Sequence, residues 1–250
     1  MLKGEREREI INLLKSRDSF ISVKELCDKL YASESSIRRD LTSLEKKGII
    51  SRTYGGAELI KNFSSVKSFN KRFNHNRKAK QIIADKAKKL IKDGSIIFLD
   101  QSSSAFYLAN EIIDNSTLTV VTNNIEIISL LSNSGIRVIS SGGILSNENR
   151  TCLIGADAHN VFESIYADTV FFSAKSLSAD GVISDCTREE ILIRNIMLKN
   201  ADTKVFLCDS EKLNTHSFYK QCSLKEVDYL ISENEKALEF KKHFPTLKLI

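Results

Sequence analysis

The sequence predicts an α/β protein of two domains, and three observations lead to this prediction. Over residues 1–60, apolar residues repeat with helical spacing and then give way to a short β-branched stretch that ends in a glycine pair. From residue 76, short apolar runs alternate with helical patterns, which is typical of a mainly parallel sheet covered on both faces. With 250 residues, the chain is long enough for one or two hydrophobic cores. We expect domains at residues 1–60 and 76–250, joined by a linker at residues 61–75.

Composition excludes several classes of protein. A hydrophobic content of 42% and a charged content of 28% are ordinary for a globular chain. The apolar runs, such as residues 95–99, are too short to span a bilayer, and the charged N-terminus lacks the apolar segment of a signal peptide. The five cysteines and four histidines show no metal-ligand spacing. We expect a cytoplasmic protein with reduced thiols, no membrane contact, no metal and no other cofactor.

Three amphipathic helices are expected near the N-terminus. The second begins after Ser22 and the third after Ser33, two hydroxyl residues that can cap a helix. The third helix buries Ile37, Leu41 and Leu44, which are spaced i, i+4 and i+7. The short connection between the second and third helices predicts a helix-turn-helix, in which the second helix of the pair enters the major groove of DNA. Any three-helix bundle gives similar spacing, so this pattern alone leaves a purely structural bundle open.

The outward face of the third helix has the chemistry of a DNA-reading surface. Short polar side chains let the helix enter the groove, and arginines can fork onto guanine edges or hold phosphates. Asp40 is expected to restrain an arginine or cap locally and not to face phosphate. Residues 49–54 predict a strand that a glycine pair turns back, which makes the unit a winged helix-turn-helix. The candidate DNA-binding residues are Ser33, Ser35, Ser36, Arg38, Arg39, Thr42, Arg52, Tyr54, Gly55 and Gly56.

The net charge of +5 is distributed unevenly. Residues 1–60 hold 12 Lys and Arg against 10 Asp and Glu, residues 61–92 hold 11 against 1, and residues 93–250 hold 14 against 21. A basic segment can neutralise phosphates without reading sequence, so residues 61–92 are expected to add to DNA attraction. The alternative is that the lysines after Lys80 form a solvated helix face.

The larger domain is expected to be Rossmann-like, with a mainly parallel sheet. Strands are expected at residues 95–99, 118–122, 136–140, 169–173, 204–208, 227–231 and 247–250. Helices are expected at residues 76–92, 103–114, 123–134, 187–201 and 234–243. Ligands of such folds bind at the carboxyl ends of the strands.

Polar clusters follow five of these expected strands. Hydroxyls and amides at a helix N-terminus suit a phosphate, and glycines let a ligand approach the backbone. Ser and Asn at strand ends can also be simple helix caps, but five such clusters favour a shared pocket for an anion. The candidate effector-binding residues are Asp100, Ser102, Ser103, Ser104, Thr122, Asn123, Gly142, Gly143, Lys175 and Lys212.

The string SIRRDLTSLEKKGIISRTYGGA closely resembles the DeoR family of bacterial transcriptional regulators, which carry a TIRRDL core and a wing with His-Gly-Gly-Ala. The likeness runs from about residue 6 to residue 57, with Ser36 in place of Thr and Tyr54 in place of His. The rest of the chain is similar to the family's effector domain, which resembles ribose-5-phosphate isomerase in fold. Residues 122–123, 142–143, 155 and 209–212 carry that likeness. It implies a phosphorylated sugar or related metabolite as effector.

Two residues depart from the family pattern in the expected pocket. Asp100, Ser103 and Ser104 fall where the family shows Asp-x-Gly-Thr-Thr, and Ser102 replaces the glycine. Lys175 stands where family members usually carry an acidic residue. Both departures favour a more anionic or smaller ligand.

We therefore expect a sequence-specific transcriptional regulator, a repressor of carbohydrate metabolism genes. Its expected partners are a double-stranded DNA operator, a phosphorylated sugar and further copies of the chain, as a dimer or tetramer. One alternative is a sugar-phosphate isomerase-like enzyme fused to a DNA-binding module, for which Asp100, Asp185 and Glu189 offer carboxylates. Lys175 disfavours that alternative, and we expect no catalytic residue. The other alternative is an architectural DNA-binding protein without an effector.

Overall fold

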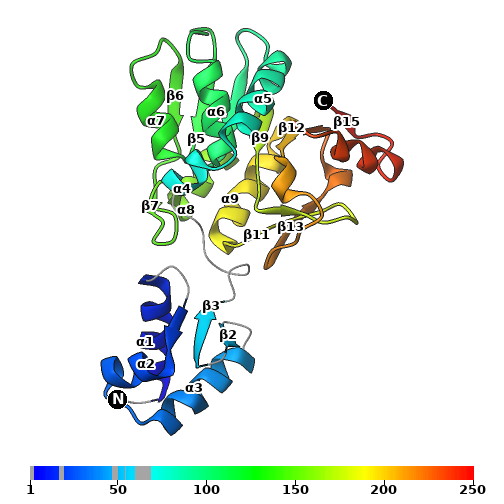
Figure 1. Cartoon of the computed structure of the whole chain (residues 1–250). Helices are drawn as coiled ribbons and strands as arrows, with labels where there is room; N and C mark the ends of the chain where they lie inside the picture. Colours follow the sequence, from blue (N-terminus) through cyan, green and yellow to red (C-terminus); the bar gives the residue numbers. More distant parts are fainter. Residues whose placement is uncertain (1–2, 17–19, 47–49, 54, 60–68) are drawn as a thin grey trace. The chain divides into compact units, whose positions relative to one another are not determined.

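The computed structural model describes residues 3–16, 20–46, 50–53, 55–59 and 69–250 (Figure 1). The chain divides into two compact units, Met1–Ser65 and Val66–Ile250. Residues 61–68 of the expected linker lie outside the described residues. The remainder of that expected linker is largely helical, because Phe69–Asn74 forms helix α4 of the larger unit.

The N-terminal unit contains three helices and a three-stranded antiparallel sheet within its described residues. The elements are α1 (Lys3–Ser16), β1 (Phe20–Ser22), α2 (Val23–Leu30), α3 (Glu34–Lys46), β2 (Ile50–Thr53) and β3 (Gly56–Leu59). The sheet order is β1-β3-β2, so the β2–β3 hairpin is the expected wing. The three amphipathic helices are confirmed. Strand β1 was not anticipated, because three residues are too few to show a period.

The caps and core of this unit follow from the sequence. The Ser22 hydroxyl accepts the Glu25 amide at 3.2 Å, which starts α2. Helix α2 ends at Tyr31, whose backbone is left-handed with φ 49°. The predicted apolar stripe of α3, Ile37, Leu41 and Leu44, is at most 1% exposed. These residues pack with the apolar faces of α1 and α2 in one core.

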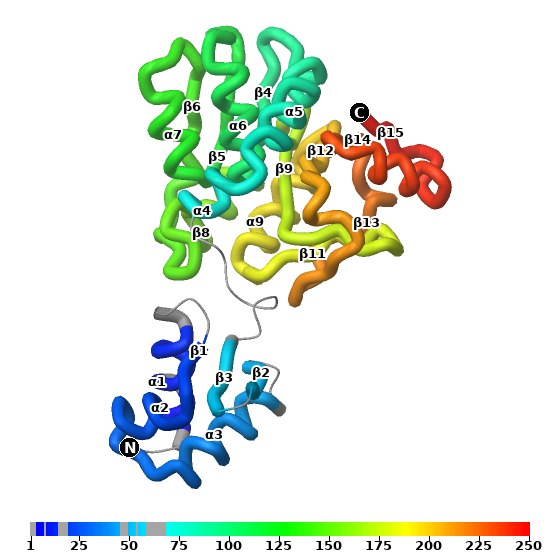
Figure 2. The backbone as a smooth tube through the Cα atoms, viewed as in Figure 1, coloured from blue at the N-terminus to red at the C-terminus, as the bar shows by residue number. Residues whose placement is uncertain are grey.

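The larger unit is built on a seven-stranded parallel sheet of order β15-β14-β12-β9-β4-β5-β6 (Figure 2). The strands are β4 (Ile96–Leu99), β5 (Thr119–Thr122), β6 (Arg137–Ser140), β9 (Ala167–Phe172), β12 (Ala201–Leu207), β14 (Tyr229–Ile231) and β15 (Lys248–Leu249). Each lies within or overlaps an expected strand. The chain leaves β4 toward β5 and β6 and returns to β9 on the other side of β4. The gap between β4 and β9 is therefore a topological switch point, where such folds bind ligands.

Helices cover both faces of this sheet. The helices are α5 (Arg77–Ala87), α6 (Ser103–Glu111), α7 (Ile125–Leu131), α8 (Ala156–Glu163) and α9 (Arg188–Lys199), with short 3-10 turns η1 (Lys88–Leu90), η2 (Ser210–Lys212), η3 (Leu224–Glu226) and η4 (Glu235–Lys242). Ile97 and Leu99 pack in one buried cluster with α5, α6 and α7, while Phe98 packs in a second cluster with α8 and α9. Alternate residues of β4 thus face opposite cores, which explains its unbroken apolar run.

Two small antiparallel elements were not anticipated. Strands β10 (Ser176–Leu177), β11 (Val182–Asp185) and β13 (Tyr219–Ser223) form a sheet of order β10-β11-β13, and β7 (Ile144–Leu145) pairs with β8 (Leu153–Ile154). The expected helix at residues 234–243 is the 3-10 segment η4 instead of an α-helix.

The five cysteines are free thiols. No helix in the part of the chain that the structure describes is long and apolar enough to cross a membrane.

Candidate functional site: a recognition helix and a strand-end pocket

Helix α3 presents its polar residues outward, at the start of the helix. The Ser33 hydroxyl lies 3.1 Å from the Ser35 hydroxyl and 3.0 Å from the Ser36 hydroxyl, so three short polar side chains gather at the first turn. Arg38 and Arg39 are exposed. The Arg38 Nη2 lies 2.7 Å from Glu34 Oε1, and Arg39 Nε donates to the carbonyl of residue 35 at 3.2 Å. Both guanidinium groups keep donors available for a base edge or a phosphate.

The wing is fastened to α3 by Arg52. Its Nη1 donates to Thr42 Oγ1 at 2.7 Å, and its backbone amide donates to Glu45 Oε1 at 3.2 Å. Two candidate DNA-binding residues, Arg52 and Thr42, are therefore partners of each other in the DNA-free chain. Asp40 restrains an arginine, as the sequence predicts, and that arginine is Arg6 of α1, at 2.5 Å.

The wing glycines have clear structural roles. Gly55 has φ 89°, in the left-handed region, and it is exposed at the turn between β2 and β3. A Cβ on Gly56 would lie 2.4 Å from the carbonyl oxygen of Ile21, so this glycine lets β3 approach β1. Tyr54, the remaining wing candidate, lies outside the described residues.

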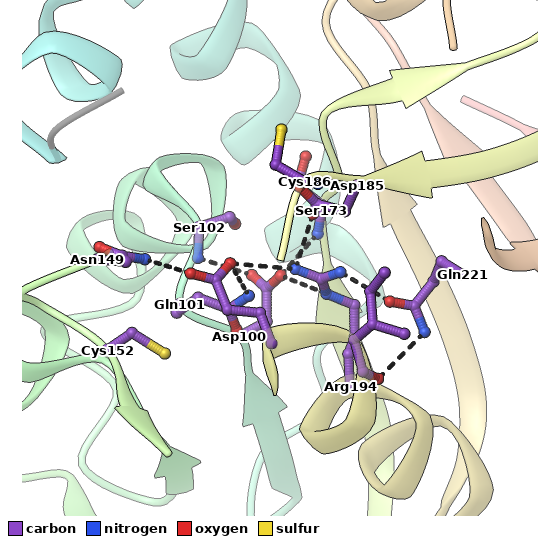
Figure 3. A network of polar contacts seen from close by, with 12 residues as sticks. Asp100, Gln101, Ser102, Asn149, Cys152, Ser173, Asp185, Cys186, Arg194 and Gln221 are labelled. Atoms are coloured by element: carbon purple, nitrogen blue, oxygen red, sulfur yellow. Dashed lines mark hydrogen bonds and ion pairs between the residues drawn. The ribbon is translucent and has the colours of Figure 1, made fainter. Parts of the chain in front are cut away.

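In the larger unit, the carboxylate of Asp100 joins the two sides of the switch point. Its Oδ1 accepts the Ser102 amide at 3.1 Å, next to β4 (Figure 3). Its Oδ2 accepts the Ser173 amide, which follows β9, at 3.1 Å and Arg194 Nε at 3.2 Å. Asp100 is fully buried, so these three donors replace the water that a carboxylate would otherwise hold.

Arg194 of α9 is the central cation of this network. It is 1% exposed, lies 3.2 Å from Asp185 Oδ2 and donates to Gln221 Oε1 at 2.8 Å. Burial disfavours its charge, but Asp185, Asp100 and Glu190 together hold the pKa of Arg194 above its ordinary value. Arg194 was not among the sequence candidates.

A signal for Arg194 is present in the sequence. Glu190, Ile193, Arg194 and Met197 share the i, i+3, i+4, i+7 stripe that α9 buries. Two charged residues on an apolar helix face indicate a buried ion pair or a functional site.

Glu190 extends the network away from Arg194. Its Oε2 accepts Gln101 Nε2 at 2.8 Å, and its Oε1 accepts Asn149 Nδ2 at 2.9 Å. Burial and the neighbouring Asp185 raise the pKa of Glu190. Neither Gln101 nor Asn149 was among the sequence candidates, because an isolated amide in a polar segment gives no pattern.

Five buried side-chain atoms of the larger unit have no hydrogen-bond partner among the described residues. They are Gln101 Oε1, Ser104 Oγ, Asn123 Oδ1, Asn124 Nδ2 and Thr187 Oγ1. The residues follow β4, begin α6, follow β5 and precede α9, so all five belong to loops and helix starts that come directly after strands. Buried polar atoms in folded proteins almost always have partners, so this group of orphaned atoms is what a polar ligand would satisfy.

Lys212 stands at the end of β12, on the other side of the switch point. Its Nζ donates to Ser173 Oγ at 2.6 Å and lies 3.3 Å from Asp209 Oδ2. Burial opposes the charge of Asp209, but Lys212 and a hydrogen bond from Asn76 hold its pKa below the usual value. Ser173 thus connects the predicted residues Asp100 and Lys212.

Lys80 of α5 is a buried lysine whose pKa is influenced by the charge of Lys212. It is 4% exposed and donates to the backbone carbonyls of Arg72 and His75. Burial, reinforced by the charge of Lys212, lowers the pKa of Lys80 to about 8. Lys86 and Lys88 also bond within this unit, to the carbonyl of Ser232 and to Glu111. Part of the predicted basic segment therefore holds the sensor unit together.

The other pocket candidates divide into two groups. Ser102, Ser103, Ser104, Thr122 and Asn123 are at most 7% exposed and lie at the ends of β4 and β5. Some of them already serve the fold, since Ser102 Oγ accepts the Ala105 amide and Thr122 Oγ1 donates to the carbonyl of Leu99.

Gly142, Gly143 and Lys175 form the second group. Gly142 and Gly143 have φ 60° and 100° and are exposed. A Cβ on Gly143 would lie 2.4 Å from the carbonyl oxygen of Ile154, so it is required for the β7–β8 region. Lys175 is half-buried. Burial raises the pKa of the Cys186 thiol, and the positive charge of Lys175 offsets part of this rise. Among the described residues, no hydrogen bond or ion pair joins these three residues to Asp100 or Arg194.

The fold and the site together define a class of protein, one that joins a winged helix-turn-helix unit to a Rossmann-like unit with a buried polar network at its strand ends. Comparison with known proteins agrees with both parts. Residues 6–63 match the DeoR-like helix-turn-helix domain, and residues 75–234 match the DeoR C terminal sensor domain. The chain belongs to the DeoR family of transcriptional regulators. It is a DNA-binding regulator and not an enzyme, so the isomerase alternative is set aside.

Two relatives illustrate the match, and one solved structure is similar to part of the chain. The HTH-type transcriptional regulator GolR of Listeria innocua is 36% identical over 94% of this chain and 92% of its own length. The lactose phosphotransferase system repressor of Staphylococcus aureus is 29% identical over 94% of each chain. The structure of ribose 5-phosphate isomerase A from Methanocaldococcus jannaschii shares 21% identity over 54% of this chain and 53% of that chain, with a TM-score of 0.40.

Proposed function

We propose that the protein is a cytoplasmic repressor of carbohydrate metabolism genes and that a phosphorylated sugar controls its binding to an operator. The observation that carries the effector site is the set of orphaned buried atoms, Gln101 Oε1, Ser104 Oγ, Asn123 Oδ1, Asn124 Nδ2 and Thr187 Oγ1. Two of these are carbonyl acceptors, two are hydroxyls and one is an amide donor, a combination that suits a ligand carrying both hydroxyl protons and anionic oxygens. Relatives named as repressors, one of them of a lactose phosphotransferase system, support the direction of regulation and the sugar class.

The phosphate is expected at the start of α6. The first-turn amides of a helix have no intrahelical partners, and the dipole favours an anion there. Ser103 and Ser104 add hydroxyls at this point, and Lys212 supplies a positive charge from the far side of the switch point. Ser102 is engaged as the helix cap, so its hydroxyl helps to form the phosphate loop and does not contact the ligand.

On the DNA side, α3 reads the major groove with the serines at its first turn and with Arg38 and Arg39. The wing, held by Arg52, contacts the backbone. A single helix-turn-helix reads few base pairs, and such proteins ordinarily pair their modules on repeated half-sites. We therefore propose a homo-oligomer, a dimer or a tetramer, assembled through the larger unit.

Thermal shift over a panel of pentose and hexose phosphates tests the effector site. A ligand at about 100 times its dissociation constant stabilises its domain by roughly 2.7 kcal/mol. Ser103→Ala and Lys212→Ala should lose that shift while still binding operator DNA, whereas Lys225→Ala, an exposed lysine of η3, should behave like the wild type.

Operator binding measured with and without the stabilising sugar phosphate completes the test. Release of DNA by the wild type, with a weaker response in the two pocket variants, is expected. Absence of any shift across the panel would favour an architectural protein without an effector.

A further inference from the structure

Helix α4 lies within the expected linker, is the first described element of the larger unit, and is bonded into that unit. Phe69 and Phe73 pack edge-on against Phe106 of α6, with ring centroids 5.6 and 5.4 Å away. Phe73 also stacks on Tyr107, whose hydroxyl donates to the Phe73 carbonyl at 3.2 Å. The position of α4 is therefore fixed against the same helix whose first turn borders the pocket.

A continuous series of hydrogen bonds joins α4 to the pocket. Arg72 Nη2 of α4 donates to Asn149 Oδ1 at 3.1 Å, and Asn149 Nδ2 donates to Glu190 Oε1 at 2.9 Å. The other oxygen of Glu190 accepts Gln101 Nε2 at 2.8 Å. The remaining atom of that amide, Gln101 Oε1, is one of the orphaned atoms of the pocket.

These contacts leave little freedom to the intermediate residues. Asn149 is 2% exposed, Glu190 is 3% exposed and Gln101 is 1% exposed. Both oxygens of Glu190 accept an amide, and Asn149 Oδ1 accepts Thr151 Oγ1 at 3.0 Å as well as Arg72. A buried acceptor that loses its donor incurs the cost of desolvation, so a shift of Gln101 favours a compensating shift of Glu190 and Asn149.

We propose that Gln101, Glu190, Asn149 and Arg72 form a relay that couples occupancy of the pocket to the position of helix α4. Asn149 and Arg72 are positioning residues, because they act on the ligand only through Glu190 and Gln101. A ligand hydroxyl that donates to Gln101 Oε1 reorients the Gln101 amide, which changes the hydrogen bonds to Glu190, to Asn149 and to Arg72 of α4. The relay rests on the proposed effector site, but the contacts that define it can be tested without any effector.

The first test is amide hydrogen–deuterium exchange of the full chain, without ligand. Gln101→Ala and Asn149→Ala should each accelerate exchange in α4 by several-fold, while α7 (Ile125–Leu131) serves as an internal reference for general destabilisation. The double variant should exchange no faster than the faster single variant, because both changes break one chain of contacts. Asn147→Ala, an exposed asparagine two residues from Asn149, is the matched control and should match the wild type.

Additive effects of Gln101→Ala and Asn149→Ala on α4, or no effect of either variant, would overturn the relay. Acceleration of α7 to the same extent as α4 would also overturn it, since the variants would then only loosen the unit. Arg72→Lys, which keeps a charged donor on α4, should restore part of the protection that Arg72→Met loses.

The second test uses reciprocity between linked sites. If the pocket acts on the DNA-binding unit through α4, then DNA bound to that unit must act on the pocket. Operator DNA, selected from random sequences by the wild-type chain, should change the exchange of residues 100–106 in the wild type and in Asn147→Ala, and should leave it unchanged in Asn149→Ala.

The outcomes of this test separate the two proposals. The relay is contradicted if DNA does not change the hydrogen exchange of residues 100–106 in the wild type. It is also contradicted if DNA changes this exchange equally in Asn149→Ala. A DNA response that depends on Asn149, combined with a failed sugar-phosphate panel, would support the relay while contradicting the proposed effector.

Discussion

In the N-terminal unit, Ser35, Arg38 and Arg39 are exposed on α3, whereas in the larger unit Asp100, Gln101 and Ser104 are at most 1% exposed. The exposed group makes short-range contacts along one helix, such as that between Arg38 and Glu34. The buried group makes contacts between residues far apart in the chain, such as that between Asp100 and Arg194. The two units thus hold their candidate functional residues under different energetic conditions.

The difference follows from the size of each partner. DNA binds to a convex surface, so the protein keeps its arginines hydrated until the phosphates and bases replace water. A small ligand must be enclosed, so its binding groups are desolvated in advance and must be satisfied by other protein groups or by the ligand. Substitutions of the buried polar residues in the larger unit should therefore change its stability. Substitutions of the exposed polar residues on α3 should instead change DNA binding.

Arg194→Met is expected to have the largest effect. It removes the cation that faces the buried carboxylates Asp100 and Asp185, and breaking a buried ion pair on one side costs about 3–5 kcal/mol. Calorimetric unfolding of the larger unit measures the change. Arg188→Met, at an exposed position of the same helix, should stay within about 0.5 kcal/mol of the wild type. If Arg194→Met and Arg188→Met both change the free energy of unfolding by the same small amount, the buried network does not stabilise the larger unit as proposed.

Because of Lys80, the stability of the larger unit should rise as the pH increases from 8 to 10. Its pKa falls from an ordinary 10.5 to about 8 in the folded chain, so above pH 8 the folded state releases this proton while the unfolded state keeps it. The unfolded state then binds more protons, and stability rises with pH until the unfolded lysine also titrates near 10.5. Between pH 8 and 10, the free energy of unfolding should rise by about 2 kcal/mol relative to Lys80→Met.

Denaturant unfolding of both chains at each pH, followed by circular dichroism, measures this difference. A constant gap between wild type and variant over that interval would mean that Lys80 titrates normally. Lys225→Met, at an exposed position, is the control for the substitution itself.

Arg39→Ala should weaken specific operator binding by about 1–3 kcal/mol if the guanidinium contacts a base. Arg39→Lys keeps the charge but loses the fork, so it should retain non-specific binding and lose discrimination between operator and random DNA. Fluorescence anisotropy with labelled DNA at fixed salt measures both effects. Arg38→Ala tests the neighbouring position in the same way. If both alanine variants bind the operator as tightly as the wild type, α3 is not the recognition helix.

Tyr31→Gly should have the smallest effect, and it should increase stability. Tyr31 is 96% exposed and has φ 49°, so the side chain gains little from packing while its backbone conformation favours glycine. A gain of about 0.5 kcal/mol in the N-terminal unit is expected, because the strain relieved exceeds the entropy that glycine adds to the unfolded chain. Tyr166→Gly is the control, since Tyr166 is 84% exposed without a positive φ and should lose stability. Thermal unfolding in which the transitions of the N-terminal unit and the larger unit are resolved measures the effect of each variant on its own unit.

Much of the fold could be predicted because its signals are local. The apolar stripe at Ile37, Leu41 and Leu44 determines the buried face of α3, and the unbroken run at residues 95–99 indicates a strand with cores on both sides. Strands of two or three residues, such as β1 and β10, carry too few side chains to show a period. They exist because tertiary neighbours satisfy their backbone groups.

The sequence by itself determined the helix-turn-helix, the alternation of strands and helices, and the polar residues that follow the strands. The tertiary structure alone decided that Ser173 joins Asp100 to Lys212 and that Arg194 faces Asp100 across 94 positions of sequence. It also decided that Asn149 joins Glu190 to Arg72 of α4. The physical reason is that periodicity records which face of an element is buried, whereas the partner of a buried charge depends on strand order, which brings β4 beside β9.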